Sequence, residues 1–249
     1  MSSKIYIVGM GPGTGEMMTP QADHALCGSD AIVGYPVYLK LLGGKYREKE
    51  FLSTPMKQEV RRCEMCFEEA EKGKTVAMVC SGDAGVYGMA SLLYEMSEAH
   101  PGCELEVIPG ITAANSGAAA LGAPLNHDYC VISLSDLMTP WEIIEKRLAA
   151  AAVGDFCMAI YNPSSHHRAD YLKKACDILQ KNGVEPERAC GYVENIGREN
   201  TACEVCTLAE LRECQVNMFT TVFIGNSRTK IIGGKLVTPR GYVLPDPAV

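Results

Sequence analysis

Short β-rich runs alternate with helical segments along this chain of 249 residues, and several of the runs lead directly into glycine. The predicted strands cover residues 4–8, 31–33, 75–80, 105–108, 129–134, 156–161, 189–194 and 219–224. The predicted helices start at Thr19-Pro20 and Thr112 or cover residues 57–72, 84–98, 140–152 and 168–182. Strands separated by helices indicate a parallel type of α/β sheet with both faces covered.

The alternation is interrupted once, near the middle of the chain. Residues 123–128, with the sequence APLNHD, have neither helical nor strand character, and the alternation restarts after them. We therefore predict two α/β domains, residues 1–124 and 125–249, with a ligand cleft between them.

The composition excludes several classes of protein. Hydrophobic residues make up 47% of the chain, which is enough to offset the entropy of folding, so disorder is excluded. With 23 basic and 30 acidic residues the net charge is −7, and no basic cluster suggests a nucleic-acid surface. No apolar run is long enough to span a membrane and no export signal is visible, so we expect a cytoplasmic protein without membrane contact.

The first glycine-rich loop, residues 9–15, follows the first predicted strand. Its spacing does not fit the dinucleotide fingerprint G-x-G-x-x-G, because Thr14 or Glu16 occupies the third glycine position, depending on the starting glycine. A phosphate-binding P-loop is excluded because no Gly-Lys-Ser/Thr follows. A nicotinamide-dependent oxidoreductase therefore stays a disfavoured alternative.

Two further loops follow strands at the same predicted sheet edge, at residues 79–88 and 107–116. Open α/β sheets bind ligands at this edge. Asp83 either caps a helix or accepts hydrogen bonds from a ligand, and the flanking Gly82 and Gly85 suggest close approach to the backbone. The Thr112 hydroxyl either caps the next helix or contacts a ligand.

The chain contains twelve cysteines, including two Cys-x-x-Cys pairs, Cys63/Cys66 and Cys203/Cys206. Four thiolates would suit zinc or an iron–sulfur cluster. The first pair lies on a predicted helix and the second in a strand-like run, where residues i and i+3 point to opposite faces. We therefore expect no metal site and interpret most cysteines as small buried side chains.

The set GxGPG, VCSGDAGVYG and PGITAANSGAAALGAPL, in this order and spacing, resembles the tetrapyrrole (corrin/porphyrin) methyltransferases over nearly the whole chain. The resemblance implies a class III methyltransferase fold, S-adenosylmethionine as cofactor, S-adenosylhomocysteine as product, and a homodimer. By motif, the implied cofactor contacts are Pro12, Gly82, Asp83, Ala84, Val86, Thr112 and Ala113, with Tyr161 from the second domain.

Motifs near Tyr35, and around residues 160–168, 195–199 and 237–242, are most similar to one branch of this family. That branch methylates C17 of precorrin-3B or cobalt-factor III and contracts the corrin ring in cobalamin biosynthesis. Methylation of another ring carbon and a non-catalytic tetrapyrrole carrier remain alternatives, and fold alone does not decide among them.

Methyl transfer to an electron-rich ring carbon needs no protein nucleophile, so the protein mainly aligns two reactants. The catalytic residues are therefore unknown, and His127, His166 and His167 are candidate bases by residue type only. A substrate with many carboxylates needs local basic groups. Arg168 and Arg198 either bind these carboxylates or form salt bridges.

Overall fold

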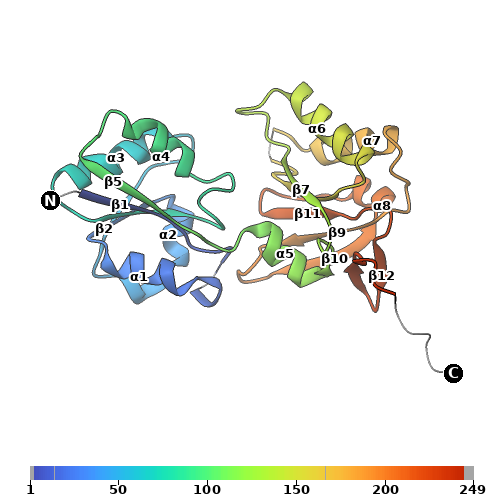
Figure 1. Ribbon diagram of the computed structural model, residues 1–249, viewed down its shortest axis with the longest axis horizontal. Helices are drawn as coiled ribbons and strands as arrows, with labels where there is room; N and C mark the ends of the chain where they lie inside the picture. Colours follow the sequence, from blue (N-terminus) through green and yellow to red (C-terminus); the bar gives the residue numbers. More distant parts are fainter. Residues whose placement is uncertain (1–2, 14, 166, 244–249) are drawn as a thin grey trace. The chain divides into compact units, whose positions relative to one another are not determined.

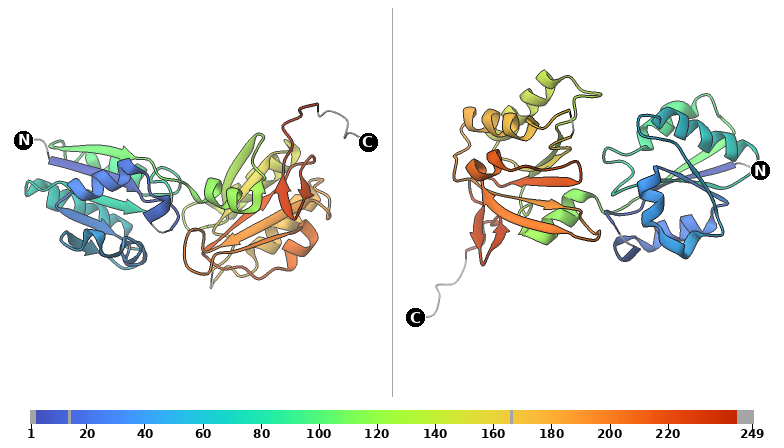
Figure 2. Two further views of the ribbon diagram at one scale, coloured as in Figure 1. Left: turned by 90° about the horizontal axis from the view of Figure 1, so that it is seen from below. Right: turned by 180° about the vertical axis from the view of Figure 1, so that it is seen from behind.

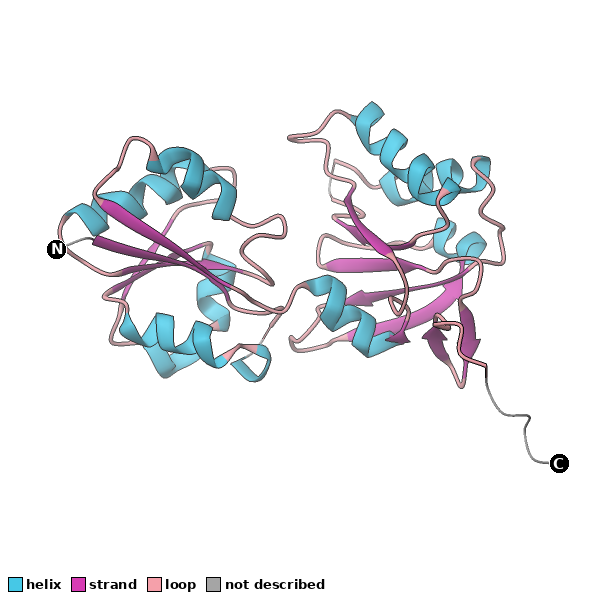
Figure 3. Ribbon diagram, in the orientation of Figure 1, coloured by secondary structure: helices cyan, strands magenta, loops and turns pink. Residues whose placement is uncertain are grey.

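The structure is a computed structural model that describes residues 3–13, 15–165 and 167–243 (Figures 1 and 3). The chain divides into two compact units, Met1–Ala113 and Ala114–Val249. Each unit is a mixed arrangement of helices and one five-stranded sheet, as the alternation in the sequence predicts.

The first unit contains a parallel sheet with strand order β3-β2-β4-β1-β5. Its strands are β1 (Ser3–Gly9), β2 (Ala31–Gly34), β3 (Glu50–Ser53), β4 (Val76–Cys80) and β5 (Cys103–Ile108). Its helices are η1 (Gly15–Met17), α1 (Pro20–Gly28), α2 (Pro36–Leu41), η2 (Gly43–Tyr46), α3 (Glu59–Glu71) and α4 (Ala90–Ser97). The sequence did not predict β3 or α2, which are short elements.

Side chains of the buried strands alternate between two cores, one on each face of this sheet. Ile5 and Ile7 of β1 pack with α3 and α4, whereas Val8 packs with α1. Figure 1 shows α3 and α4 on the face opposite α1, and Figure 2 shows the same layers from two other sides. The predicted start of α1 is confirmed, because the Thr19 side chain accepts the N–H of Ala22 and Pro20 begins the helix.

Two helix predictions need correction. The helix predicted over residues 84–98 begins only at Ala90, because the preceding segment turns with Tyr87 at a φ of 55°. In α3, Val60 was predicted on the apolar face but is 54% exposed. Arg62 is instead the buried side chain of the first turn, while Cys63 and Phe67 are buried as predicted.

The second unit contains a sheet with strand order β10-β9-β11-β8-β7. Its strands are β7 (Tyr129–Ser133), β8 (Cys157–Tyr161), β9 (Ala189–Glu194), β10 (Ala202–Thr207) and β11 (Thr220–Ile224). Only β7 and β8 are parallel, so the prediction of a parallel sheet is wrong for this unit. A short connection joins β9 to β10, and such a connection permits only antiparallel pairing.

Helices cover one face of the second sheet, and α5 lies against the other (Figure 1). The elements are α5 (Ala113–Leu121), α6 (Trp141–Val153), α7 (Tyr171–Lys181) and α8 (Leu208–Glu213). A small sheet, β12 (Lys230–Ile232), β13 (Lys235–Val237) and β6 (Gly122–Ala123), completes the unit.

The division between the units lies earlier than the predicted boundary at residue 124, because α5 and β6 pack with the second unit. The backbone of Gly117 in α5 approaches Phe223 and Ile196 so closely that a Cβ would lie 2.7 Å and 2.9 Å from their side chains. In addition, β6 pairs with β13. Within the described residues, none of the helices is both long and apolar enough to cross a membrane.

Candidate functional site

The three glycine-rich loops follow β1, β4 and β5, which are neighbours in the first sheet. The helix after β1, α1, packs on one face of the sheet, whereas the helix after β4, α4, packs on the other. Chain connections therefore diverge between these adjacent strands. In open α/β sheets this divergence marks the edge where ligands bind.

The loops are joined to one another through glycine backbones. Gly11 and Gly82 form an antiparallel bridge, in which Gly11 donates to the carbonyl of Gly82 (3.0 Å) and Gly82 donates to that of Gly11 (2.7 Å). A Cβ on Gly110 would lie 2.1 Å from the carbonyl oxygen of Gly82 and 2.5 Å from that of Gly9. Only glycine permits this approach, so the three loops form one closely packed platform.

The glycines beside Asp83 have a different role from the one the sequence suggested. A Cβ on Gly82 would meet its nearest atom at 3.6 Å, so space does not require glycine there, but a φ of 69° does. A Cβ on Gly85 would approach only the Asp83 carboxylate, at 3.3 Å. Glycine is therefore required at Gly110 because the third loop approaches the backbone of the first and second loops, and not because a ligand approaches it.

The Asp83 carboxylate connects two of these loops. Its Oδ1 accepts the N–H of Gly85 (2.8 Å) and its Oδ2 accepts the N–H of Gly110 (2.9 Å). The side chain is half-buried. Asp83 thus fixes the position of the third loop relative to the second, and a contact with a cofactor remains a prediction.

The other predicted cofactor residues of the first unit lie at the same edge. Pro12 and Ala84 are buried, while Val86, Thr112 and Ala113 are half-buried. Asp83 is the only acidic or basic residue in the described parts of these loops. Cys80, the last residue of β4 and part of the second loop, is buried, and burial raises the pKa of its thiol to about 11. The platform thus offers backbone groups and small side chains but no activated thiol.

Tyr161 lies at the carboxyl end of β8 in the second unit. Its hydroxyl accepts the backbone N–H of Ala114 at the start of α5 (2.7 Å). Tyr161 therefore holds a helix start within its own unit, and its predicted cofactor contact remains a prediction.

Arg168 is part of a side-chain cluster beyond the ends of β7 and β8. Its Nε donates to Oδ1 of Asp136 (2.6 Å), and the Tyr171 hydroxyl donates to Oδ2 of the same carboxylate (2.7 Å). These two hydrogen bonds, first that of Tyr171 and then that of Arg168, lower the pKa of Asp136. The sequence analysis missed Asp136 and Tyr171, because no local pattern connects residues so far apart in the chain.

Arg198, the second predicted carboxylate-binding residue, lies beside an aromatic ring of its own unit. Its guanidinium carbon is 5.1 Å from the ring centroid of Phe219. Arg168 is thus in an ion pair and Arg198 in a cation–π contact. Substrate binding by either arginine remains a prediction.

The structure assigns the role of catalytic base to neither of the candidate histidines that it describes, His127 and His167. Nδ1 of His127 accepts the backbone N–H of Asp128 (2.9 Å), and His127 lies between β6 and β7. His167 is exposed in the connection from β8 to α7. His166 lies outside the described residues.

All twelve cysteines are free thiols. Seven are buried, as the interpretation of cysteine as a small apolar side chain predicts. Burial raises the pKa of Cys63 to about 12 and that of Cys66 well above its usual value. Along β10, Cys203 is exposed and Cys206 buried, so these two thiols do not face the same side. The described part of the chain contains no group of three or more potential metal ligands.

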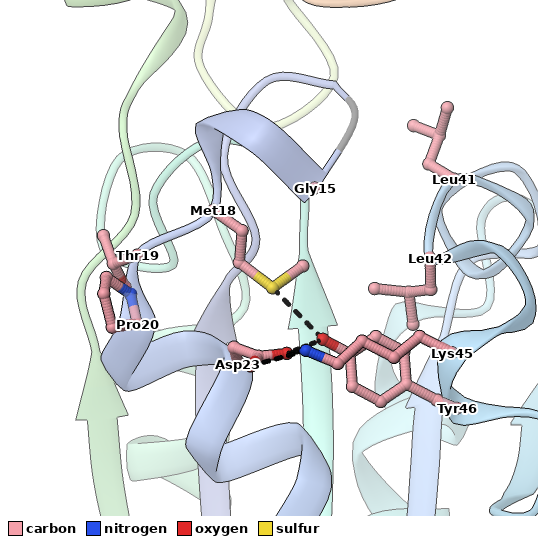
Figure 4. Close-up of a pocket in the computed structure, with 9 residues that line it drawn as sticks. All are labelled: Gly15, Met18, Thr19, Pro20, Asp23, Leu41, Leu42, Lys45 and Tyr46. Carbon is pink, nitrogen blue, oxygen red and sulfur yellow. Dashed lines mark hydrogen bonds and ion pairs between the residues drawn. The ribbon is translucent and has the colours of Figure 1, made fainter.

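A cavity of about 490 Å³ lies beside the first glycine loop (Figure 4). Its polar side chains bond to one another: Lys45 donates to both oxygens of Asp23 (2.5 and 2.6 Å), and the Tyr46 hydroxyl donates to the same carboxylate. These hydrogen bonds lower the pKa of Asp23. The remaining lining residues are Gly15, Met18, Thr19, Pro20, Leu41 and Leu42.

Comparison with known proteins identifies relatives of this chain over nearly its whole length. The sequence profile of the tetrapyrrole (corrin/porphyrin) methylases matches residues 4–212. A probable cobalt-factor III C(17)-methyltransferase of Salmonella typhimurium is 41% identical over 241 residues, covering 96% of this chain and 100% of that protein. A cobalt-factor III methyltransferase of Priestia megaterium is 44% identical over 97% of this chain, but this chain spans only 46% of that protein.

Solved structures show the same fold. The crystal structure of the methyltransferase CobJ superposes with a TM-score of 0.88 at 38% identity, covering 96% of this chain and 100% of that one. A uroporphyrin-III C-methyltransferase from Thermus thermophilus, complexed with S-adenosylhomocysteine, superposes with a TM-score of 0.68 at 20% identity, covering 89% of this chain and 92% of that one. The predicted class III methyltransferase fold is thereby confirmed.

Proposed function

Because this chain belongs to the tetrapyrrole (corrin/porphyrin) methylase family, we propose that it transfers a methyl group from S-adenosylmethionine to C17 of cobalt-factor III. Transfer accompanies contraction of the macrocycle, which places C20 outside the ring. The observation that carries the proposal is the 41% identity with the Salmonella protein over 96% of this chain and the whole of that protein.

The platform at the carboxyl edge of the first sheet fits a cofactor of this kind. Its described loops present backbone groups and small or half-buried side chains, including Thr112, at a topological switch point. When bound, S-adenosylmethionine supplies an electrophilic methyl group. The residues that hold it in this proposal are Pro12, Gly82, Asp83, Ala84, Val86, Thr112 and Ala113, with Tyr161 from the second unit.

The absence of an activated thiol in these loops agrees with a reaction in which a ring carbon of the substrate is the nucleophile. The protein then contributes position: Asp83 fixes the relative position of the second and third loops through Gly85 and Gly110. Alignment of two reactants can supply about 7–11 kcal/mol of the barrier reduction. The nicotinamide alternative is not supported, because its fingerprint is absent and the matched family consists of methylases.

Calorimetric titration of the purified protein with S-adenosylhomocysteine tests the cofactor, with NADH as the control ligand. We expect one S-adenosylhomocysteine per chain and no heat from NADH. Incubation of the protein with S-adenosylmethionine and cobalt-factor III under anaerobic conditions tests the reaction. A ring-contracted product methylated at C17 is expected, and a product methylated at another carbon would refute the proposed position.

We also propose that the enzyme is a cytoplasmic homodimer that acts on a small-molecule tetrapyrrole, with no nucleic-acid or membrane partner. These expectations derive from the family resemblance and the net charge of −7. Light scattering coupled to size-exclusion chromatography tests the oligomeric state, and a mass of one 26.9 kDa chain would contradict it.

A further inference from the structure

The first turn of α3 contains a buried positive charge. Arg62 is 5% exposed, on a helix whose other buried side chains include Cys63, Cys66 and Phe67. Buried charges are normally paired, because an unpaired ion loses its hydration without compensation. No ion pair involves Arg62 among the residues that the structure describes.

The hydrogen bonds of Arg62 use only part of its guanidinium. Nη2 donates to the carbonyl oxygens of Thr54 (3.3 Å) and Pro55 (3.1 Å). Nε is completely buried and has no hydrogen-bond partner, and Nη1 has no acceptor in the described parts of the chain. The guanidinium carbon lies 5.7 Å from the ring centroid of Tyr35. Two of the three nitrogen atoms thus lack an acceptor among the described residues.

The helix end beside Arg62 is also electropositive. Gln58, which precedes α3, makes no side-chain cap. Within the described residues, the backbone N–H groups of Glu59 and Val60 have no acceptor. The Glu59 carboxylate accepts the backbone N–H of Lys57 (3.2 Å) and not that of a first-turn residue. A guanidinium at a helix N-terminus is electrostatically unfavourable for the helix, so helix stability does not explain its position.

Arg62 lies at the same edge of the sheet as the glycine loops. Tyr35 directly follows β2, and Thr54 directly follows β3, so both contacts of Arg62 are at the carboxyl ends of parallel strands. Tyr35 belongs to the motif GYPVY at residues 34–38, and neither the glycine platform nor the proposed reaction gives this motif a role. The unpaired guanidinium and the uncapped helix end therefore occur together where ligands bind such sheets.

We propose that Arg62, the backbone N–H groups of Glu59 and Val60 and the ring of Tyr35 form a binding site for one carboxylate side chain of the tetrapyrrole. This inference rests on the proposed function. One carboxylate oxygen can accept a charge-assisted hydrogen bond from Nη1 while the other accepts from a backbone N–H of the helix end. Residues 55–58, which adjoin Arg62, are exposed, so solvent lies close to this part of the site.

The test compares Arg62→Met with Arg61→Met. Arg61 is the adjacent residue, but its side chain is exposed and paired with Glu64 and Glu68. Arg61→Met therefore removes the same charge without changing the proposed carboxylate site. Binding of cobalt-factor III and of S-adenosylhomocysteine is measured for each variant by calorimetry. We expect Arg62→Met to weaken cobalt-factor III binding at least about tenfold, since a charge-assisted hydrogen bond is lost, and to leave S-adenosylhomocysteine binding unchanged. Arg61→Met should change neither.

Thermal unfolding separates a ligand-binding role from a structural one. If Arg62 binds a ligand, a folded Arg62→Met variant binds cobalt-factor III more weakly than Arg61→Met does, whatever stability it loses with the hydrogen bonds to Thr54 and Pro55. A variant that is less stable but retains wild-type affinity for cobalt-factor III would overturn the proposal. If Arg62→Met does not fold, Arg62→Lys keeps the charge without the planar group, and unchanged affinity in that variant would also overturn it.

A small probe keeps this test independent of the proposed substrate. Sodium propionate, compared with sodium chloride at equal ionic strength, should raise the melting temperature of the wild type by about 1 °C or more, but not that of Arg62→Met. This shift supports the carboxylate site even if cobalt-factor III does not bind, in which case the proposed function alone fails. An equal shift in both proteins, or none in the wild type, would refute the site.

Discussion

The edges of the two sheets are built by different means. In the first unit, loops after β1, β4 and β5 contact one another through backbone atoms, with glycine at each close approach. In the second unit, the segments after β7 and β8 are joined by the side chains of Asp136, Arg168 and Tyr171. A backbone contact tolerates no added atom, whereas a side-chain contact can be weakened in steps, so substitutions should affect the two edges differently.

The largest effect is expected from Gly110→Ala in the first edge. Its Cβ would lie 2.1 Å from the carbonyl oxygen of Gly82, a backbone atom that cannot rotate away. We expect a loss of about 3 kcal/mol in the free energy of unfolding and loss of S-adenosylhomocysteine binding. Chemical denaturation and calorimetry measure these quantities.

Gly28→Ala, at the end of α1, is the control because nothing lies within 4 Å of its added Cβ. It should leave both quantities nearly unchanged. Wild-type stability in Gly110→Ala would show that the glycine platform is less closely packed than the structure indicates.

A smaller effect is expected for Asp83, which accepts one hydrogen bond within its own loop and one from the third loop. Asp83→Ala leaves the N–H groups of Gly85 and Gly110 without their acceptor, for a cost of about 1–3 kcal/mol in the free energy of unfolding. Asp83→Asn retains one acceptor oxygen and should lie between the wild type and Asp83→Ala, in stability and in S-adenosylhomocysteine affinity. If both variants lose affinity equally without losing stability, Asp83 contacts the cofactor directly instead of positioning the third loop.

The smallest effect is expected from Asp136→Asn in the second edge, about 1 kcal/mol at neutral pH. The pKa of Asp136 is lowered in the folded protein, so its stabilising contribution is complete above the pKa of the unfolded chain, about 4. It is lost as the pH falls through the still lower pKa of the folded state. Urea denaturation should therefore show that the wild type is more stable than Asp136→Asn at pH 7 and that this difference in the free energy of unfolding decreases at pH 3. A difference that does not change with pH would refute the stabilising role of the Asp136 carboxylate.

The sequence by itself determined the elements and motifs that depend on neighbouring residues. It predicted the start of α1 from Thr19 and Pro20, because an N-cap and a first-turn proline act locally. It also placed three glycine-rich loops after strands and, through their order, identified the family. The failed dinucleotide spacing was equally visible in the sequence, since it depends only on counting residues.

The tertiary structure decided everything that depends on residues far apart in the chain. The pairing of Asp136 with Arg168, and the contact of Gly110 with Gly82, join segments that no local pattern relates. The antiparallel pairing of β11 with β8 and β9 joins strands that are distant in the chain, and strand propensity does not show which strands pair. The sequence did not show that Arg62 is buried and Val60 exposed, for the same reason. Helical spacing shows which side chains lie on one face of a helix, but only tertiary packing shows which face is covered.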